Sequence, residues 1–181
     1  ILIINGQGFV LNNILTPKQK QRVETLINPS SDPLGSGWNI TQSKIAIGSG
    51  GVFGKGFLKG TQTGLNFVPI QSTDFIFSVI GEEFGYLGSM IFIILYVIFL
   101  YRILILSEAQ KDRFARVFGY SVFSIFLFHF TINVSMTLGL FPVIGIPLSL
   151  ISYGGSSLLS FSLLLFVFLK LNGVKSAILG R

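Results

Sequence analysis

The sequence predicts an all-α integral membrane protein, a polytopic helix bundle with a large extracellular loop. Half of its 181 residues are hydrophobic and only 11% are charged, whereas soluble domains carry about 25% charged residues. The mean hydropathy is +0.73. Apolar runs long enough to cross a hydrocarbon core of about 30 Å recur along the chain. The composition therefore excludes an ordinary soluble domain.

The first half of the chain divides into segments by composition. Residues 1–15 are apolar but interrupted by Asn and Gly, and we interpret them as the end of a transmembrane helix that starts before this chain. Residues 16–73 form a large polar loop, rich in Pro, Gly, Ser and basic side chains, which we expect to be extracellular. Residues 74–101 are the first complete transmembrane helix, and residues 102–116 are a short charged loop.

The second half contains two further apolar runs. Residues 117–138 are expected to form a transmembrane helix, followed by an extracellular or re-entrant loop at 139–157. Residues 158–171 are short for a span, but the preceding serines can extend them into a third one. Residues 172–181 are a basic tail.

Basic residues set the expected orientation. The 102–116 loop and the 172–181 tail are both basic, and two crossings separate them, so the positive-inside rule assigns both to the cytoplasm. The net charge of +6 is then explained by orientation and anionic headgroups, and no nucleic-acid partner is expected. The absence of cysteine excludes disulfides and thiolate sites.

Asp74, at the start of the first complete span, is the strongest candidate for chemistry. Carboxylates at a membrane boundary are costly and usually functional. On a continuous helix, Ser78, Gly81, Gly85 and Gly88 would lie on the side of Asp74 and let a neighbour approach closely. Asp74 is therefore expected to point into a protein groove. The alternative is a structural role as a helix N-cap, which Asp favours.

Other polar residues lie within the expected spans. Glu82 and Glu83 diverge by about 100° around a helix, and we interpret them as structural groups that lock helices together. Their alternative role is a proton path in a transporter. His129, Asn133 and Thr137 repeat every four residues, which indicates interhelical hydrogen bonding. A proton relay through His129 is the alternative.

The glycine-rich run at 48–60, GSGGVFGKGFLKG, is not a nucleotide-binding P-loop. Ser49 stands where the first Gly belongs, and Gly56 stands where Ser or Thr is needed. No nucleotide or haem cofactor is expected. The backbone amides, with Lys55 and Lys59, could still hold a diphosphate. The alternative is a flexible or interfacial loop.

The SYGGSS run at 152–157 follows several helix-breaking Pro and Gly residues. Non-helical backbone at membrane depth is tolerated where it lines a cavity or is buried in protein. The run therefore indicates a re-entrant loop. The hydroxyls of Ser152, Ser156 and Ser157 could contact a sugar or a phosphate.

Three stretches resemble the SEDS family, the shape, elongation, division and sporulation proteins that include RodA, FtsW and SpoVE. They are DPLGSGWNITQSKIAIGSGGVFGKGFLKGTQ at 32–62, STDFIFSVIGEEFGYLG at 72–88 and GLFPVIGIPLSLISYGGSS at 139–157. The set DPLG, QSKIAIGSGG, GKG and GTQ resembles the RodA branch more than the FtsW division branch. The similarity extends over nearly the whole chain.

The resemblance implies that the chain is the C-terminal part of a ten-helix fold. It also implies a peptidoglycan glycosyltransferase that polymerises lipid II, with inversion, outside the bacterial cytoplasmic membrane during elongation and maintenance of rod shape. The implied partners are lipid II or another undecaprenyl-diphosphate-linked glycan, a class B penicillin-binding protein with transpeptidase activity, and other membrane proteins of the elongation complex.

The resemblance assigns the family's essential Asp, in its TDFIF motif, to Asp74. In the preceding Pro-Glu-x-His-Thr-Asp pattern of the family, Ile70 and Ser72 replace the Glu and the His here. Ser149 stands where Pro is common. Candidate substrate-binding residues in the matching motifs are Gln42, Ser43, Lys55, Lys59, Thr73, Ser152, Ser156 and Ser157.

The implied mechanism uses Asp74 as a general base that removes the proton from the acceptor sugar's 4-hydroxyl. The leaving diphosphate needs positive charge, which a divalent cation (Mg²⁺ or Mn²⁺), Lys55 or Lys59 could supply. Asp74 could instead ligate that cation.

Two other functions stay open from the sequence. The first is a lipid II flippase, a transporter in which Glu82, Glu83 and His129 would carry the protons. The second is a non-catalytic scaffold for a class B transpeptidase.

Overall fold

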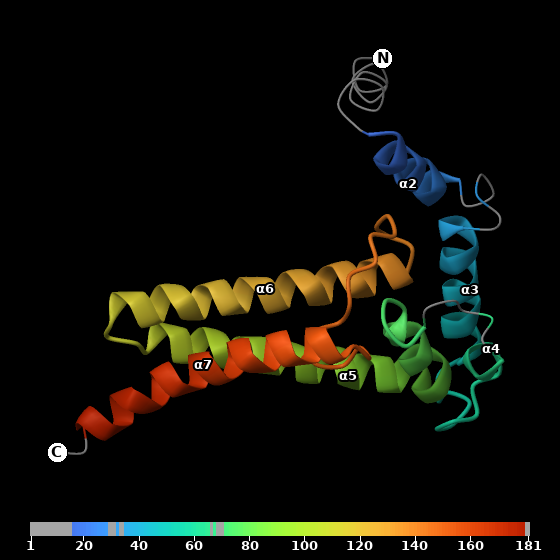
Figure 1. The fold of residues 1–181 in the computed structure, drawn as a ribbon. Helices are drawn as coiled ribbons and strands as arrows, with labels where there is room; N and C mark the ends of the chain where they lie inside the picture. The colour runs from blue at the N-terminus through green and yellow to red at the C-terminus, as the bar shows by residue number, and fades with distance from the viewer. Residues whose placement is uncertain (1–15, 29–31, 33–34, 66, 68–70, 180–181) are drawn as a thin grey trace, which may run out of the picture.

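The computed structural model describes residues 16–28, 32, 35–65, 67 and 71–179, with side chains up to residue 173. The helix end expected at residues 1–15 lies outside this part, as does Ile70. Within the described part, every regular element is a helix (Figure 1). The helices are α2 (Pro17–Ile27), α3 (Ser36–Ser49), α4 (Thr61–Gly64), α5 (Ile76–Glu108), α6 (Arg113–Thr137) and α7 (Gly155–Leu179).

The three long helices, α5, α6 and α7, run side by side (Figure 1). The short helix α3 stands across one end of this bundle, with α2 beyond it, and α7 ends toward the opposite end (Figure 1). All three long helices are apolar and long enough to span a membrane, over Ile76–Glu108, Arg113–Thr137 and Gly155–Gly173. The prediction of an all-α, polytopic helical membrane protein is confirmed.

The boundaries of the spans differ from the expected ones. The helix expected over 74–101 begins at Ile76 and continues to Glu108, and the next one begins at Arg113. The charged loop expected over 102–116 is therefore a short turn, because Arg and Lys form helices well and can extend their charges toward headgroups. The start of α6 is fixed by Asp112, whose Oδ2 accepts a hydrogen bond from the Ala115 amide at 3.2 Å.

The expected loop over 16–73 contains three helices of its own. Helix α2 begins after Thr16, whose amide donates to Oε1 of Gln19 at 2.9 Å. Asp32 supplies a hydrogen-bond acceptor for the first amide of α3, because its Oδ2 accepts from the Ser36 amide at 2.9 Å. Capping of this kind fixes where a helix begins without any apolar periodicity.

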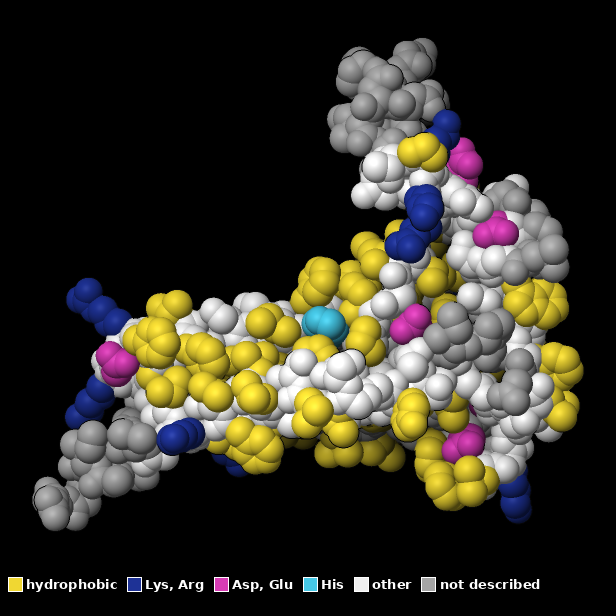
Figure 2. Space-filling view, in the orientation of Figure 1, with side chains coloured by type: hydrophobic (Ala, Val, Ile, Leu, Met, Phe, Trp, Pro, Cys, Tyr) yellow, Lys and Arg dark blue, Asp and Glu magenta, His cyan; other side chains and the backbone are white. Residues whose placement is uncertain are grey.

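An aromatic core holds the long helices together. The rings of Tyr96 on α5 and Phe130 on α6 stack with centroids 4.3 Å apart. Phe126 on α6 packs against Phe161 on α7 at 5.6 Å. The outer faces of the long helices are covered by hydrophobic side chains, while Lys and Arg side chains gather on α2 and at the far end of the bundle (Figure 2). This distribution suits a bundle surrounded by lipid.

Helix α5 is broken at Gly85, where φ is 66° and ψ is −162°. This conformation is essentially restricted to glycine. The carbonyls of Glu82 and Glu83 lose their helical partners there, and they accept hydrogen bonds from the amides of Lys55 (3.0 Å) and Gly56 (2.9 Å). The glycine-rich run therefore supplies the donors that the broken helix needs.

The amides beyond the break are satisfied by the same run. Tyr86 donates to the carbonyl of Gly51 at 2.9 Å, and Leu87 donates to that of Val52 at 3.1 Å. Such two-way pairing completes the backbone hydrogen bonding of a buried helix break. The run at 48–60 thus acts as a structural insert against α5, which leaves the amides of Lys55 and Gly56 unavailable for a phosphate.

Candidate functional site

Asp74 lies in a turn immediately before α5, whose first helical residue is Ile76. The N-cap position belongs to Phe75, and no side chain makes a capping hydrogen bond there. The N-cap alternative for Asp74 is therefore wrong. The helical alignment of Asp74 with Gly85 is wrong as well, because Asp74 precedes the helix and Gly85 interrupts it.

The side chain of Asp74 lines a groove of about 450 Å³. A Cβ at Gly145 would approach Oδ2 of Asp74 to 3.1 Å, so the glycine keeps the space beside the carboxylate open. The groove is formed by α2, the start of α3 and the loop between α6 and α7. Its described lining residues are Lys18, Gln21, Arg22, Asp32, Ser36, Asp74, Val143, Ile144 and Gly145.

The environment of Asp74 shifts its acidity. Partial burial raises the pKa of Asp74 above its ordinary value of 3.8, and a hydrogen bond from the Thr73 side chain opposes this shift. Burial acts in this direction because it disfavours the charged carboxylate. A carboxylate with a raised pKa is a better proton acceptor than an ordinary surface aspartate.

Two polar side chains of α6 hold the chain around Asp74. Asn133 is fully buried, and its Nδ2 donates to the carbonyls of Asp74 and Ile146, each at 2.8 Å. Nδ1 of His129 lies 3.1 Å from the carbonyl of Pro147, which makes Nδ1 the donor. His129 and Asn133 therefore bond to loop backbone and to the segment before α5. At Thr137 the expected interhelical hydrogen bond is present, because its carbonyl accepts from the Ser43 hydroxyl of α3 at 2.8 Å.

The loop after α6 is also tied to the segment that carries Asp74. The hydroxyl of Ser152 donates to the carbonyl of Thr73 and accepts from the amide of Leu148. The amide of Tyr153 donates to the carbonyl of Ser72 at 2.8 Å. Ser152 is thus a structural bridge within protein, and its hydroxyl is already engaged on both sides.

Glu82 is fully buried and surrounded by donors. Its Oε1 accepts from Nζ of Lys55 at 2.7 Å and from the amides of Thr61 and Gln62, both at 2.8 Å. Its Oε2 accepts from the amide of Thr63 at 2.9 Å. Glu82 therefore anchors α4 to α5. Lys55 is committed to this carboxylate and does not line the Asp74 groove, contrary to the expected role at a diphosphate.

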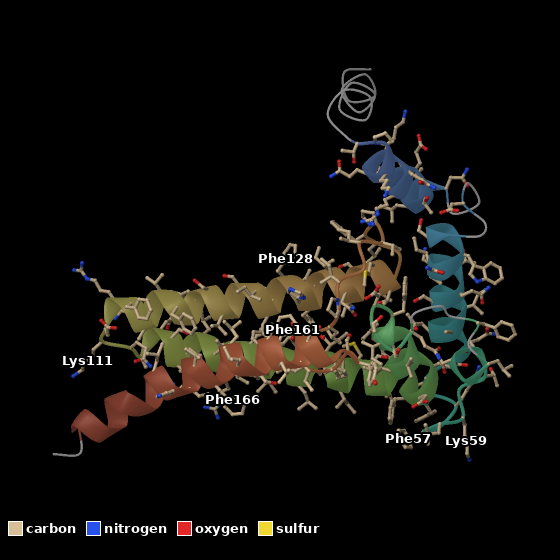
Figure 3. The ribbon with its side chains drawn as sticks, viewed as in Figure 1. Phe57, Lys59, Lys111, Phe128, Phe161 and Phe166 are labelled. Atoms are coloured by element: carbon tan, nitrogen blue, oxygen red, sulfur yellow. The ribbon has the colours of Figure 1, made fainter. Side chains whose placement is uncertain are left out.

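Lys59 and Glu83 also lie away from the groove. Lys59 is exposed and points outward near Phe57, at the edge of the molecule (Figure 3). Glu83 is largely buried and lines a separate pocket with Thr63 and Ser72. Its carboxylate accepts no hydrogen bond from the part of the chain that the structure describes.

Four further candidates lie away from the groove. Gln42 and Ser43 are buried in α3, where the Ser43 hydroxyl donates to the carbonyl of Thr137 at 2.8 Å. Ser157 donates to the carbonyl of Gly154 within its own turn, and Ser156 is exposed at the start of α7. None of the four lines the Asp74 groove.

Ser149, at the position where Pro is common, is fully buried.

The groove contains two cations that the sequence interpretation missed. Lys18 and Arg22 lie one helical turn apart on α2 and line the groove with Gln21. No ion pair involves either of them among the described residues. The i, i+3, i+4 spacing after the Thr-Pro helix start could have indicated one polar face, but nothing in that spacing points to Asp74.

Comparison with known proteins identifies relatives. A family model described as "Cell cycle protein", which groups FtsW, RodA and SpoVE, matches residues 1–176. The chain is 46% identical to the peptidoglycan glycosyltransferase RodA of Treponema pallidum, over 87% of this chain and 36% of that protein. It is 48% identical to the peptidoglycan glycosyltransferase MrdB of Escherichia coli K12, over 78% of this chain and 38% of that protein.

A solved structure supports the same assignment. Its description reads "Structural coordination of polymerization and crosslinking by a peptidoglycan synthase complex", and one of its chains matches with a TM-score of 0.73 and 30% identity. The match covers 94% of this chain and 46% of that one. The chain thus spans less than half the length of these relatives. It belongs to the FtsW, RodA and SpoVE family of cell cycle proteins, the family that its three motifs indicated.

Proposed function

We propose that this chain is the C-terminal part of a RodA-type peptidoglycan glycosyltransferase, which polymerises lipid II into β-1,4 glycan strands during elongation and maintenance of rod shape. The observation that carries the proposal is the carboxylate of Asp74, with its raised pKa, in the wall of a groove that also holds cations. The activity named for the relatives from Treponema pallidum and Escherichia coli supports this proposal.

In the proposed reaction, two lipid-linked glycans occupy the groove side by side. A carboxylate oxygen of Asp74 accepts the proton of the acceptor's 4-hydroxyl as that oxygen attacks the anomeric carbon of the donor. The bond from the anomeric carbon to the diphosphate oxygen breaks, and the electron pair leaves with undecaprenyl diphosphate. Attack from the face opposite the leaving group converts an α-linked donor into a β-linked product.

The surroundings of Asp74 favour this role over a structural one. Its main-chain carbonyl accepts a hydrogen bond from Asn133, whereas its side chain lines the groove. The Thr73 side chain is a hydrogen-bond donor to that carboxylate. A backbone held by a buried side chain, with a carboxylate that reaches the groove, is the arrangement that a general base requires, because its distance from the substrate is then set in advance.

A divalent cation, Mg²⁺ or Mn²⁺, is part of the proposal. Asp32 and Asp74 both line the groove, and Mg²⁺ is commonly held by one or two carboxylates together with substrate phosphates. Oδ2 of Asp32 is engaged by Ser36, so Asp74 is the carboxylate that would hold such an ion together with substrate phosphates. When bound, it would neutralise charge on the diphosphate.

The proposed setting is the bacterial cytoplasmic membrane, with the groove on the extracytoplasmic face. The proposed partners are lipid II, a class B penicillin-binding protein and other membrane proteins of the elongation complex. The description of the matched solved structure, a peptidoglycan synthase complex that polymerises and crosslinks, supports a partner of the transpeptidase class.

The deciding experiment is lipid II polymerisation by the full-length protein with its cognate transpeptidase in detergent, where no bilayer exists to flip across. We expect long glycan strands from the wild type and none from the Asp74→Ala variant. A transporter alone would give no strands from either protein. A scaffold would leave rod growth normal in cells carrying the Asp74→Ala variant.

A further inference from the structure

We propose that Lys18 and Arg22 form the binding site for the diphosphate of the lipid-linked donor. The inference rests on the proposed function, and it assigns the positive charge that the leaving group needs to α2 and not to the glycine-rich run. In short, two cations on one face of a helix, without an ion pair in the described part of the chain, share a groove with the catalytic carboxylate.

Lys55 and Lys59, the cations that the sequence suggested for the diphosphate, are excluded by their positions. Nζ of Lys55 lies 2.7 Å from Oε1 of buried Glu82 and 2.6 Å from the hydroxyl of Thr61. Lys59 is exposed and points away from the bundle (Figure 3). Neither lines the groove of Asp74. Among the residues that the structure describes there, Lys18 and Arg22 are the groove's only positive side chains.

The spacing of the two cations suits one diphosphate. Residues four apart on a helix have Cβ atoms about 5–6 Å apart and project to the same side. Arg presents a planar fork that can bind one phosphate through two hydrogen bonds, while Lys acts as a mobile point charge on the other. Both side chains are exposed, and neither has an ion pair to give up among the described residues when an anion binds.

The helix that carries them packs against the protein at Thr25. Thr25, one turn beyond Gln21, is fully buried, and its hydroxyl donates to the Gln21 carbonyl at 2.7 Å. The nearby carboxylate of Asp32 is occupied, because its Oδ2 accepts from the amide of Ser36 at 2.9 Å and from its hydroxyl at 3.2 Å. The charge of Asp32 is therefore directed at the start of α3 and leaves the two cations available.

A phosphate-bearing ligand in this groove could come from two sources, the donor's diphosphate or an anionic phospholipid headgroup. The donor is favoured because the cations share the groove with Asp74, which is where a leaving group must be stabilised. A headgroup would need contact with the membrane surface but no proximity to that carboxylate.

The test uses the full-length protein with its cognate transpeptidase in detergent free of phospholipid. Calorimetric titration with farnesyl diphosphate, and with farnesol as the uncharged comparison, measures binding without requiring turnover. The test variant is Lys18→Ala/Arg22→Ala, and the charge-conserving variant is Lys18→Arg/Arg22→Lys. The matched control is Lys111→Ala/Arg113→Ala, which removes two exposed cations at the turn between α5 and α6; Lys111 is labelled in Figure 3.

We expect the test variant to weaken farnesyl diphosphate binding at least tenfold, with farnesol binding and the midpoint of thermal unfolding unchanged. The charge-conserving variant should recover most of the affinity, and the control should bind like the wild type. Equal affinity of wild type and test variant would overturn the inference. A second measurement compares wild type and test variant in nanodiscs of phosphatidylglycerol and of phosphatidylcholine. If the test variant differs from the wild type only in phosphatidylglycerol, the cations bind a lipid headgroup and the inference is overturned.

The two proposals fail differently. If the wild type forms no glycan strands but the test variant still loses farnesyl diphosphate binding, the glycosyltransferase proposal fails and the anion site stands. If the wild type polymerises lipid II and the test variant binds the diphosphate normally, the anion site fails and the glycosyltransferase proposal stands.

Discussion

The side-chain amide of Asn133 donates a hydrogen bond of 2.8 Å to the main-chain carbonyl of Asp74. The same nitrogen donates to the carbonyl of Ile146 at 2.8 Å. One buried side chain of α6 thereby joins the segment before α5 to the loop between α6 and α7. The position of Asp74 is consequently set by a helix that follows it far along the chain.

Replacement of Asn133 by Ala should impair both stability and polymerisation. The change leaves two partly buried carbonyls without this donor, and each such loss costs roughly 1–3 kcal/mol. Thermal unfolding and lipid II polymerisation of the full-length protein measure the two effects. Ser124→Ala, an exposed serine of the same helix that bonds only within it, is the control. An Asn133→Ala protein with wild-type stability and rate would refute the positioning role.

The two neighbouring glutamates should respond differently to the same substitution. Glu82→Gln should destabilise the protein strongly, because it removes a carboxylate that accepts from Lys55 and three amides. Removing one partner of a buried ion pair is costly, since the remaining charge is left without its counter-charge. Glu83→Gln should have a smaller effect, since its carboxylate has no hydrogen-bond donor among the described residues. Unfolding midpoints of the two variants decide this. Equal midpoints would contradict the anchoring role of Glu82.

Gly85 should tolerate no side chain. Its φ of 66° disfavours any L-residue, and a Cβ there would lie 2.3 Å from the backbone nitrogen of Gly54. We expect Gly85→Ala to lower the unfolding midpoint sharply and reduce membrane-inserted yield. Gly48→Ala is the matched control, because its Cβ would meet nothing within 4 Å and alanine is the better helix former. A Gly85→Ala protein as stable as Gly48→Ala would contradict the break.

Much of the fold could be predicted from the sequence, because long apolar runs require helices wherever they cross a bilayer. The helix ends could not, since they depend on caps such as Asp112 and not on hydropathy. The break at Gly85 was also hidden. It depends on hydrogen bonds from the run at 48–60, and no local periodicity reveals a partner so distant in the chain.

For the site, Asp74 was identified from its charge at a span boundary and from its motif. Lys18 and Arg22 were missed because the groove forms only when α2 lies near the loop between α6 and α7. Lys55 was assigned to a diphosphate because the glycine-rich run around it suggested an anion site. Its actual anion is the carboxylate of Glu82, which the fold brings to it.

The Thr73 side chain should tune the pH dependence of the reaction. Burial raises the pKa of Asp74 above 3.8, and the hydrogen bond from Thr73 lowers it. A base works when ionised, so the rate of polymerisation should fall as the pH drops through this raised pKa. Thr73→Val removes the bond and should move that acidic limb to higher pH. Rate profiles of wild type and variant measure the shift, and a limb that moves to lower pH would contradict the assignment.

The most direct test of the central claim is lipid II polymerisation by full-length Asp74→Asn, compared with Asp112→Asn. Asn can still cap α6 at position 112, so this control changes the same chemical group away from the groove. We expect Asp74→Asn to form no glycan strands while unfolding no earlier than the wild type at neutral pH, because it removes a partly desolvated charge. We expect Asp112→Asn to polymerise normally. Wild-type polymerisation by a folded Asp74→Asn protein would contradict the role of this carboxylate as the base.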